Sequence, residues 1–191
     1  MTSKITNINK KTCLIILKIL AAVFSYGWIS AYSETLFDST SNPVFDYDSV
    51  TDGVVIQSSF STLSDPVELT KLTLKWVRKA DDRGVVLVTL LADNSGFPGA
   101  TIEIMSLFDV NAYPVTQSWL ILPINKLNPL LARTRYWIEI RASSAAGAIA
   151  YSRQHKGVGV IGEAYKNMYG LNQNVKTGPY ILRLEANRIA E

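Results

Sequence analysis

The chain has 191 residues, with 19 lysines and arginines, 16 aspartates and glutamates, one histidine and one cysteine. A single histidine and a single cysteine exclude a catalytic site built on paired imidazoles and a structural zinc site built on several thiolates. Four lysines and no acidic residue lie in residues 1–33, so the remainder carries 15 basic and 16 acidic side chains. A domain so close to neutral lacks the basic surface that nucleic-acid binding requires.

The first 33 residues resemble a secretory signal peptide. Lysines supply a positive amino-terminal region, residues 19–29 form an apolar run, and Ala31-Tyr32-Ser33 places small residues ahead of a cut before Glu34. This pattern predicts a mature chain, 34–191, that is secreted or periplasmic/extracellular and has no stable membrane span after cleavage. The alternatives are an uncleaved anchor over Cys13–Ile29, which Lys18 interrupts, and a cytoplasmic protein.

The mature region predicts one all-β domain, because short apolar and alternating runs are separated by turn residues and helical spacing is absent. Within Val67–Val77 the skip from Leu69 to Leu72 predicts a bulge near Thr70-Lys71. A short helical turn is expected at Asn128–Arg133 and a loop between residues 38 and 53. The expected strands are Thr35–Phe37, Val54–Phe60, Val67–Val77, Val85–Leu91, Thr101–Phe108, Ser118–Leu122, Thr134–Arg141, Gly147–Ser152, Glu163–Met168 and Pro179–Ala186. So many strands in about 150 residues favour a jelly-roll-like antiparallel β-sandwich.

Three segments carry a family resemblance: residues 90–99 (LLADNSGFPG), 130–138 (LLARTRYWI) and 177–183 (TGPYILR). Their order and spacing resemble the choice-of-anchor R domain, a β-sandwich module of exported bacterial proteins. The resemblance implies export and display at the cell envelope, and it implies no known activity. Members of that family typically end in a sorting tail, whereas this chain ends in residues 186–191 (ANRIAE), without a recognisable one.

No motif predicts catalysis. His155 lies in a polar segment and is expected to be a solvated loop residue. Gly157-Val-Gly-Val-Ile-Gly162 matches a dinucleotide fingerprint by letter, but it has neither the preceding strand nor the following helix of a βαβ unit. Glycosidase catalysis requires two carboxylates that converge in a groove. By strand parity, most of the four candidate carboxylates should instead face solvent. They are Glu103, Glu139, Glu163 and Glu185.

The acidic segment containing Asp46, Asp48 and Asp52 raises the possibility of a structural calcium ion, since Ca²⁺ is bound by carboxylate and carbonyl oxygens. The spacing does not match the twelve-residue helix–loop–helix calcium motif. The alternative is that these residues form turns through side-chain hydrogen bonds to the backbone. No cofactor is otherwise expected.

The aromatic residues are the remaining candidates for ligand contact. Trp76 and Trp119 occupy apolar positions and are expected in the core. Trp137 alternates with Tyr136 and Ile138, which places it on the opposite strand face, where it could stack on a sugar or lie under a neighbouring loop. Three tyrosines around the glycine-rich segment form a second candidate patch: Tyr151, Tyr165 and Tyr169.

These patterns together favour a non-catalytic, exported binding or structural domain, with glycan or extracellular-matrix polysaccharide as the leading ligand. The alternatives are a protein–protein assembly component that binds an envelope protein and a carbohydrate hydrolase with two catalytic carboxylates. Exposed aromatics without a carboxylate pair would favour binding, and two carboxylates across a groove would favour hydrolysis.

Overall fold

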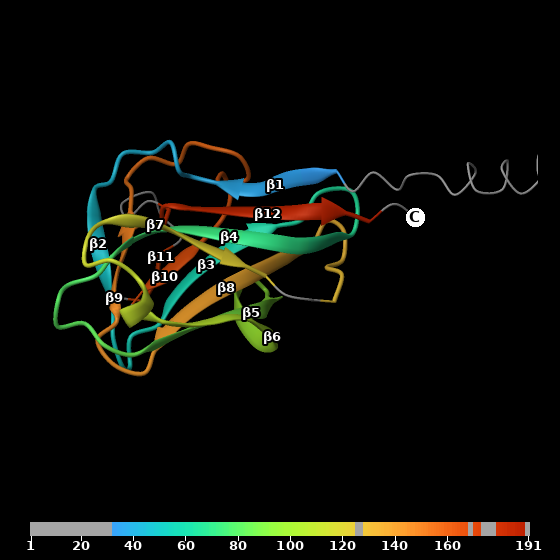
Figure 1. Cartoon of the computed structure of the whole chain (residues 1–191). Coiled ribbons are helices and arrows are strands. Elements are labelled where there is room, and N and C mark those ends of the chain that lie inside the picture. The colour runs from blue at the N-terminus through green and yellow to red at the C-terminus, as the bar shows by residue number, and fades with distance from the viewer. Residues whose placement is uncertain (1–31, 125–127, 168–169, 173–178, 190–191) are drawn as a thin grey trace, which may run out of the picture. The chain divides into compact units, whose positions relative to one another are not determined.

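Two antiparallel β-sheets pack face to face as a sandwich (Figure 1), as predicted. The computed structural model describes residues 32–124, 128–167, 170–172 and 179–189. Sheet A contains β1 (Ser33–Asp38), β2 (Asp46–Val50), β4 (Val67–Val77), β7 (Ser118–Pro123), β9 (Gly147–Tyr151) and β12 (Leu182–Arg188). Sheet B contains β3 (Ile56–Ser61), β5 (Val85–Asn94), β6 (Phe97–Asp109), β8 (Arg135–Ala142), β10 (Tyr165–Asn167) and β11 (Gly170–Asn172).

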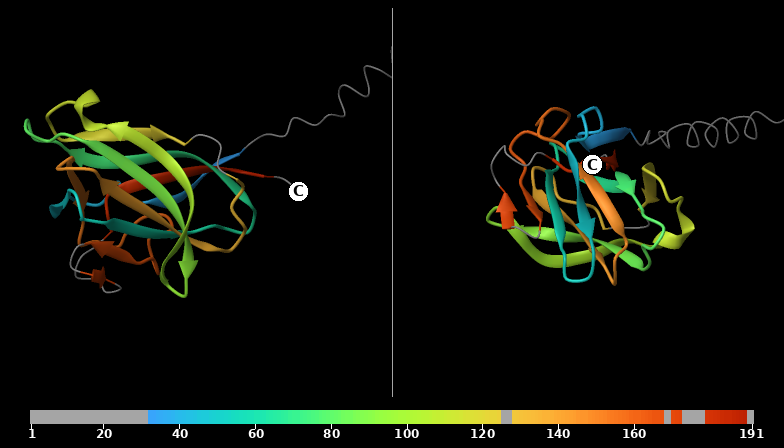
Figure 2. Two further views of the ribbon diagram at one scale, coloured as in Figure 1. Left: turned by 90° about the horizontal axis from the view of Figure 1, so that it is seen from below. Right: turned by 90° about the vertical axis from the view of Figure 1, so that its left-hand side faces the viewer.

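The strand order is that of a jelly roll. In sheet A, β12 lies between β1 and β4, and β7 pairs with the opposite edge of β4. In sheet B the central order is β3-β8-β5-β6. The chain therefore crosses repeatedly between the sheets, as two Greek keys require. The remaining strands extend this frame: β9 and β2 continue sheet A, and β10 and β11 continue sheet B (Figure 2).

The core lies between the sheets and is built from the inward-facing residues of both. On β4 the inward side chains are Leu69, Leu72, Leu74 and Trp76, all buried. The Trp76 ring meets Phe108 of β6 edge-on, with ring centroids 5.9 Å apart. Burial of each large apolar side chain contributes about 1.5–3 kcal/mol, so this shared layer holds the two sheets together.

The bulge predicted in β4 is confirmed. Glu185 of β12 pairs with Lys71 and the next residue, Ala186, pairs with Leu69, so Thr70 is the extra residue on β4. Its hydroxyl donates to the Glu185 carbonyl oxygen at 3.1 Å. The bulge keeps Leu69 and Leu72 on the same inward face although they are three residues apart.

Two local predictions are wrong. Within residues 38–53, expected to be a loop, Asp46–Val50 forms β2, because its backbone pairs with β9 along the whole length of the strand. Residues 128–133 do not form a helical turn, because Leu130 makes an isolated β-bridge to Val67. A short 3-10 helix, Val110–Ala112, follows β6 and was not expected; the Asp109 carboxylate accepts from the backbone N–H of Asn111 at its start.

The predicted signal peptide, residues 1–33, lies largely outside the described residues, which begin at position 32. Strand β1 begins at Ser33, beside the expected cleavage position. Among the described residues, no helix has the length and hydrophobicity needed to cross a membrane.

Replacing Gly147 by alanine should destabilise the fold. Gly147 has φ 131°, and an added Cβ would lie 2.6 Å from both the Val77 carbonyl oxygen and the indole nitrogen of Trp76. Gly53 is a matched control, because its φ is also positive (77°) but no atom lies within 4 Å of an added Cβ. In urea denaturation we expect Gly147→Ala to lower the unfolding free energy by about 1–3 kcal/mol more than Gly53→Ala. Equal losses of unfolding free energy in the two variants would contradict the close packing of Gly147 against Val77 and Trp76.

Candidate functional site

The outer face of sheet A carries a row of polar side chains beside an apolar edge strand. Because side chains alternate along β4, the residues between its core positions, Lys71, Thr73 and Lys75, point outward. Thr73 pairs with Arg183 of β12 on one side and with Ile121 of β7 on the other. The register thus places charged groups and exposed apolar groups next to each other on one surface.

A groove of about 380 Å³ lies on this face, within the size range of small-ligand sites. We call it the outer groove. Its lining residues come from β4, β7 and β12 and from the turn after β1: Thr40, Lys71, Thr73, Trp119, Ile121, Arg183 and Glu185.

Trp119 is exposed, so its predicted core position is wrong. Leu120 and Leu122 are the inward residues of β7, and this parity directs Trp119 and Ile121 to the outer face. Trp119 is 43% exposed and Ile121 59% exposed. The Lys75 ammonium lies 4.5 Å from the centroid of the Trp119 ring, in a cation–π contact.

Two ion pairs form the polar side of the outer groove. Lys71 Nζ lies 2.5 Å from a Glu185 carboxylate oxygen, and a guanidinium nitrogen of Arg183 lies 2.8 Å from Asp38. Arg183 also donates to the Thr40 hydroxyl at 3.2 Å. Partial burial of Asp38 opposes its ionisation, but hydrogen bonds from Thr40 and Arg183 and the charge of Arg183 outweigh it and lower the pKa of this carboxyl.

Trp137 lies on the outer face of sheet B, as parity predicts, but it does not present a stacking surface. Its side chain is fully buried beneath the segment before β10, against Leu91 and Ala164. The indole N–H donates to an Asp93 carboxylate oxygen at 2.8 Å. The predicted ligand contact at Trp137 would need a surface that this segment covers. The position of Trp137 instead matches the alternative prediction, in which it lies under a neighbouring loop.

Glu163 fixes the segment that covers Trp137. Its carboxylate accepts from the Ser59 and Ser61 hydroxyls of β3 and lies 3.3 Å from Arg135 Nε of β8. Arg135 also donates to the Gly162 carbonyl oxygen at 2.9 Å. The expectation that Glu163 faces solvent is wrong, because the segment folds back over the sheet and its side chain is only 4% exposed.

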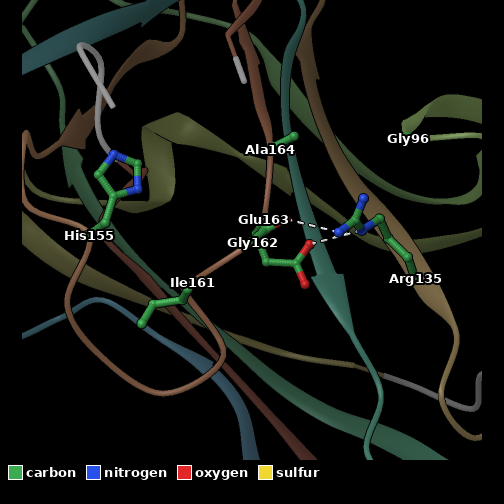
Figure 3. Close-up of a pocket in the computed structure, with 7 residues that line it drawn as sticks. All are labelled: Gly96, Arg135, His155, Ile161, Gly162, Glu163 and Ala164. Atoms are coloured by element: carbon green, nitrogen blue, oxygen red, sulfur yellow. Dashed lines mark hydrogen bonds and ion pairs between the residues drawn. The ribbon is translucent and has the colours of Figure 1, made fainter. Parts of the chain in front are cut away.

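A depression of about 420 Å³ lies beside this segment (Figure 3). Figure 3 shows Glu163 directed toward Arg135, with His155 on the other side of the depression. His155 is more enclosed than predicted, because it packs against Tyr165 and its Nε2 atom is buried. The Glu163 carboxylate forms contacts within the protein, because its two oxygens accept hydrogen bonds from the Ser59 and Ser61 hydroxyls.

Glu139 also differs from its predicted solvent exposure. It points to the outer face of sheet B, but it is 5% exposed and binds the Arg141 guanidinium and the Gln57 amide. Glu185 is engaged by Lys71, and Glu103 is partly buried on β6. Each of Glu139, Glu163 and Glu185 thus has a cationic partner within its own sheet face.

Neither of the two described members of the predicted tyrosine patch is fully exposed. Tyr165 is buried, and its burial together with the nearby Glu163 charge raises the pKa of its hydroxyl. Tyr151 is partly buried and packs against Phe45, with ring centroids 5.9 Å apart. Tyr169 lies outside the described residues.

Of the acidic residues considered for calcium, Asp46 and Asp48 lie in β2 and Asp52 lies in the turn after it. Asp48 accepts from the Tyr180 hydroxyl at 2.7 Å, and Asp46 accepts from the backbone N–H of Tyr47. Within the described parts of the chain, no three histidine, cysteine, aspartate or glutamate side chains are grouped to hold a metal ion.

A third depression, of about 550 Å³, lies where β2, β4 and β9 meet. Its aromatic member is Tyr47, whose side chain is partly buried, and burial raises the pKa of its hydroxyl. The remaining wall includes Lys79, Asp82 and Gln117. It lacks an aromatic side chain as exposed as Trp119, which makes the outer groove the stronger candidate.

No model of a known protein family matches the chain, and no curated protein matches it. One solved structure, described as the structure of infectious bursal disease virus Gt strain, gives a match with 12% identity and a TM-score of 0.20. The match covers 83% of this chain and 35% of the viral chain. The resemblance to the choice-of-anchor R domain stays a prediction.

The Asp38–Arg183 pair predicts a dependence of stability on pH. Because the pKa of Asp38 is lowered in the folded protein, the pair stabilises the fold at pH values above the unfolded pKa, about 3.9. This contribution is lost as the pH falls through the folded pKa. We expect Asp38→Asn to be less stable than the parent at pH 6, with the difference shrinking below pH 4 in thermal unfolding. A difference that grows on acidification would contradict this assignment.

Proposed function

We propose that this protein is an exported, non-catalytic β-sandwich that binds polysaccharide in the outer groove. The observation that carries the proposal is the exposed Trp119 ring on the outer face of sheet A, next to charged and hydroxyl side chains. Sugar rings have an apolar C–H face that packs on aromatic rings, while their hydroxyls form hydrogen bonds with such polar groups.

The polar groups of the outer groove suit hydroxyl recognition. Lys71 pairs with Glu185 and Arg183 pairs with Asp38, so these side chains are held in position before any ligand arrives. Preorganised donors and acceptors lose less conformational entropy on binding than free side chains do. Thr40 and Thr73 add hydroxyl groups to the same wall.

A hydrolase is the weaker alternative for this groove. Glycosidases place two carboxyl groups on either side of the scissile bond. Glu185 is the carboxylate among the described lining residues, and Lys71 binds it. Binding without cleavage is therefore the function that this arrangement supports best.

The proposal is tested by electrophoresis of the purified protein in native gels cast with a panel of neutral and acidic polysaccharides. We expect at least one polymer to retard the parent protein, and Trp119→Ala to reduce its apparent affinity at least tenfold. Phe97→Ala is the matched control, because Phe97 is an aromatic residue 52% exposed on the other sheet and should leave retardation unchanged. An unretarded parent, or equal losses in both variants, would reject the outer groove as a glycan site.

Assembly with a second copy of the chain is the second candidate, and β6 favours it. This strand forms one edge of sheet B, and an unpaired edge is a template for pairing with another chain. Exposed apolar side chains lie along it: Phe97, Ile102, Ile104 and Leu107.

Analytical ultracentrifugation tests this second candidate. Self-association through β6 predicts a concentration-dependent dimer that Ile104→Lys converts to monomer, because a lysine on an edge strand opposes pairing. Ile121→Lys, a matched change on the outer face of β7, should leave the dimer intact. A parent protein that stays monomeric up to about 100 μM, where a micromolar complex would form, excludes the dimer.

A further inference from the structure

We infer that the ligand of the outer groove is an acidic polysaccharide, whose sugar carboxylate Lys75 binds while the ring of the same sugar packs on Trp119. This inference rests on the proposed function and adds the chemical class of the ligand. It depends on the position and the pairing of one lysine.

The charges on this face are unequal. Lys71 is neutralised by Glu185, and Arg183 by Asp38. Lys75 forms no ion pair with any described acidic side chain. Its ammonium instead lies over the Trp119 ring, and it is partly buried between neighbouring strands. The outer face around the groove therefore retains a positive charge next to its stacking surface.

The register fixes this charge beside the aromatic ring. Lys75 and Trp119 are direct cross-strand partners on β4 and β7. A sugar ring on the exposed part of Trp119 would therefore have an ammonium group at its edge, where the carboxylate of a uronic acid projects. The flexible four-carbon stem allows the ammonium to move from the ring face to that carboxylate.

Movement of the Lys75 ammonium from the Trp119 ring to a sugar carboxylate favours an anionic sugar over a neutral one. A sugar carboxylate gives the displaced ammonium a charge-assisted hydrogen bond in place of the cation–π contact. A neutral sugar would displace the lysine from part of the ring without giving it a new partner. Lysine acts as a point charge, and a sulfate group could therefore also attract it; the carboxylate and sulfate arms of the test separate these sources.

The test compares polygalacturonate and hyaluronan with their fully methyl-esterified forms, which keep the same backbone but lose the charge. Dextran and dextran sulfate form the matched sulfate arm. The variants are Lys75→Gln, Trp119→Ala and Lys156→Gln, the last removing the same charge from an exposed loop outside the groove. Native-gel affinities are measured for the full chain at low and moderate salt, with thermal unfolding as a check that each variant folds.

The inference predicts that at least one carboxylate polymer retards the parent at least tenfold more strongly than its methyl ester. Lys75→Gln should lose at least tenfold in affinity for that polymer, Trp119→Ala should lose at least as much, and Lys156→Gln should behave like the parent. The loss in Lys75→Gln should shrink as salt increases.

Three results would overturn the inference, and they differ from failure of the proposed function. Equal binding of acid and ester, with Trp119→Ala defective and Lys75→Gln unchanged, rejects the carboxylate role but keeps the glycan site. Retardation of the parent by dextran sulfate, but by no carboxylate polymer, rejects a sugar carboxylate as the ligand and indicates that Lys75 binds a sulfate group. Equal losses in Lys75→Gln and Lys156→Gln indicate nonspecific attraction. If no polymer retards the parent, the proposed function itself fails.

Discussion

The register of β4 is the constraint on which both the core and the candidate site depend. This strand lies inside sheet A, with β12 along one edge and β7 along the other. Its inward residues, including Leu72, Leu74 and Trp76, fill the space between the sheets, while Lys71, Thr73 and Lys75 form the outer surface. A one-residue slip would exchange these faces, burying two lysines and exposing a tryptophan. The bulge at Thr70 preserves the arrangement by absorbing the extra residue.

The outer faces of the two sheets differ in how far they are covered. On sheet B, Glu139 and Glu163 are buried and bound to arginines, and the segment before β10 covers Trp137. Buried charges of this kind need complete pairing, which ties the covering segment to the sheet. On sheet A, the ion pairs leave a groove open and Trp119 exposed. The proposed binding of a ligand in the outer groove would therefore require no uncovering step.

Local sequence patterns were sufficient for much of the fold. Alternation and turn residues predicted the sandwich, most of its strands and the bulge in β4, because these features follow from residues close together in the chain. The acidic β2 was missed because its pairing with β9, about 100 residues later, determines its structure. The Leu130 bridge to Val67 similarly replaced an expected helical turn.

The candidate site was harder to predict for the same reason. Trp119 and Ile121 alternate with Leu120 and Leu122, so both faces of this strand are apolar and the pattern cannot say which is buried. Trp137 was placed on the correct face, but a distant segment covers it. The pairing of Lys75 with Trp119 would have identified the site, and that pairing becomes known only with the register of β4 and β7.

We propose that the outer face of sheet A is the ligand-binding surface. Nuclear magnetic resonance titration of the isotope-labelled protein with a short acidic oligosaccharide tests it most directly, because each backbone amide and each indole N–H reports separately. Binding in the outer groove predicts that the largest chemical-shift changes fall on the Trp119 indole and on the amides of β4, β7 and β12 that flank the groove. Shifts centred on Tyr47, Lys79 and Gln117 would place the ligand in the other depression and contradict the account.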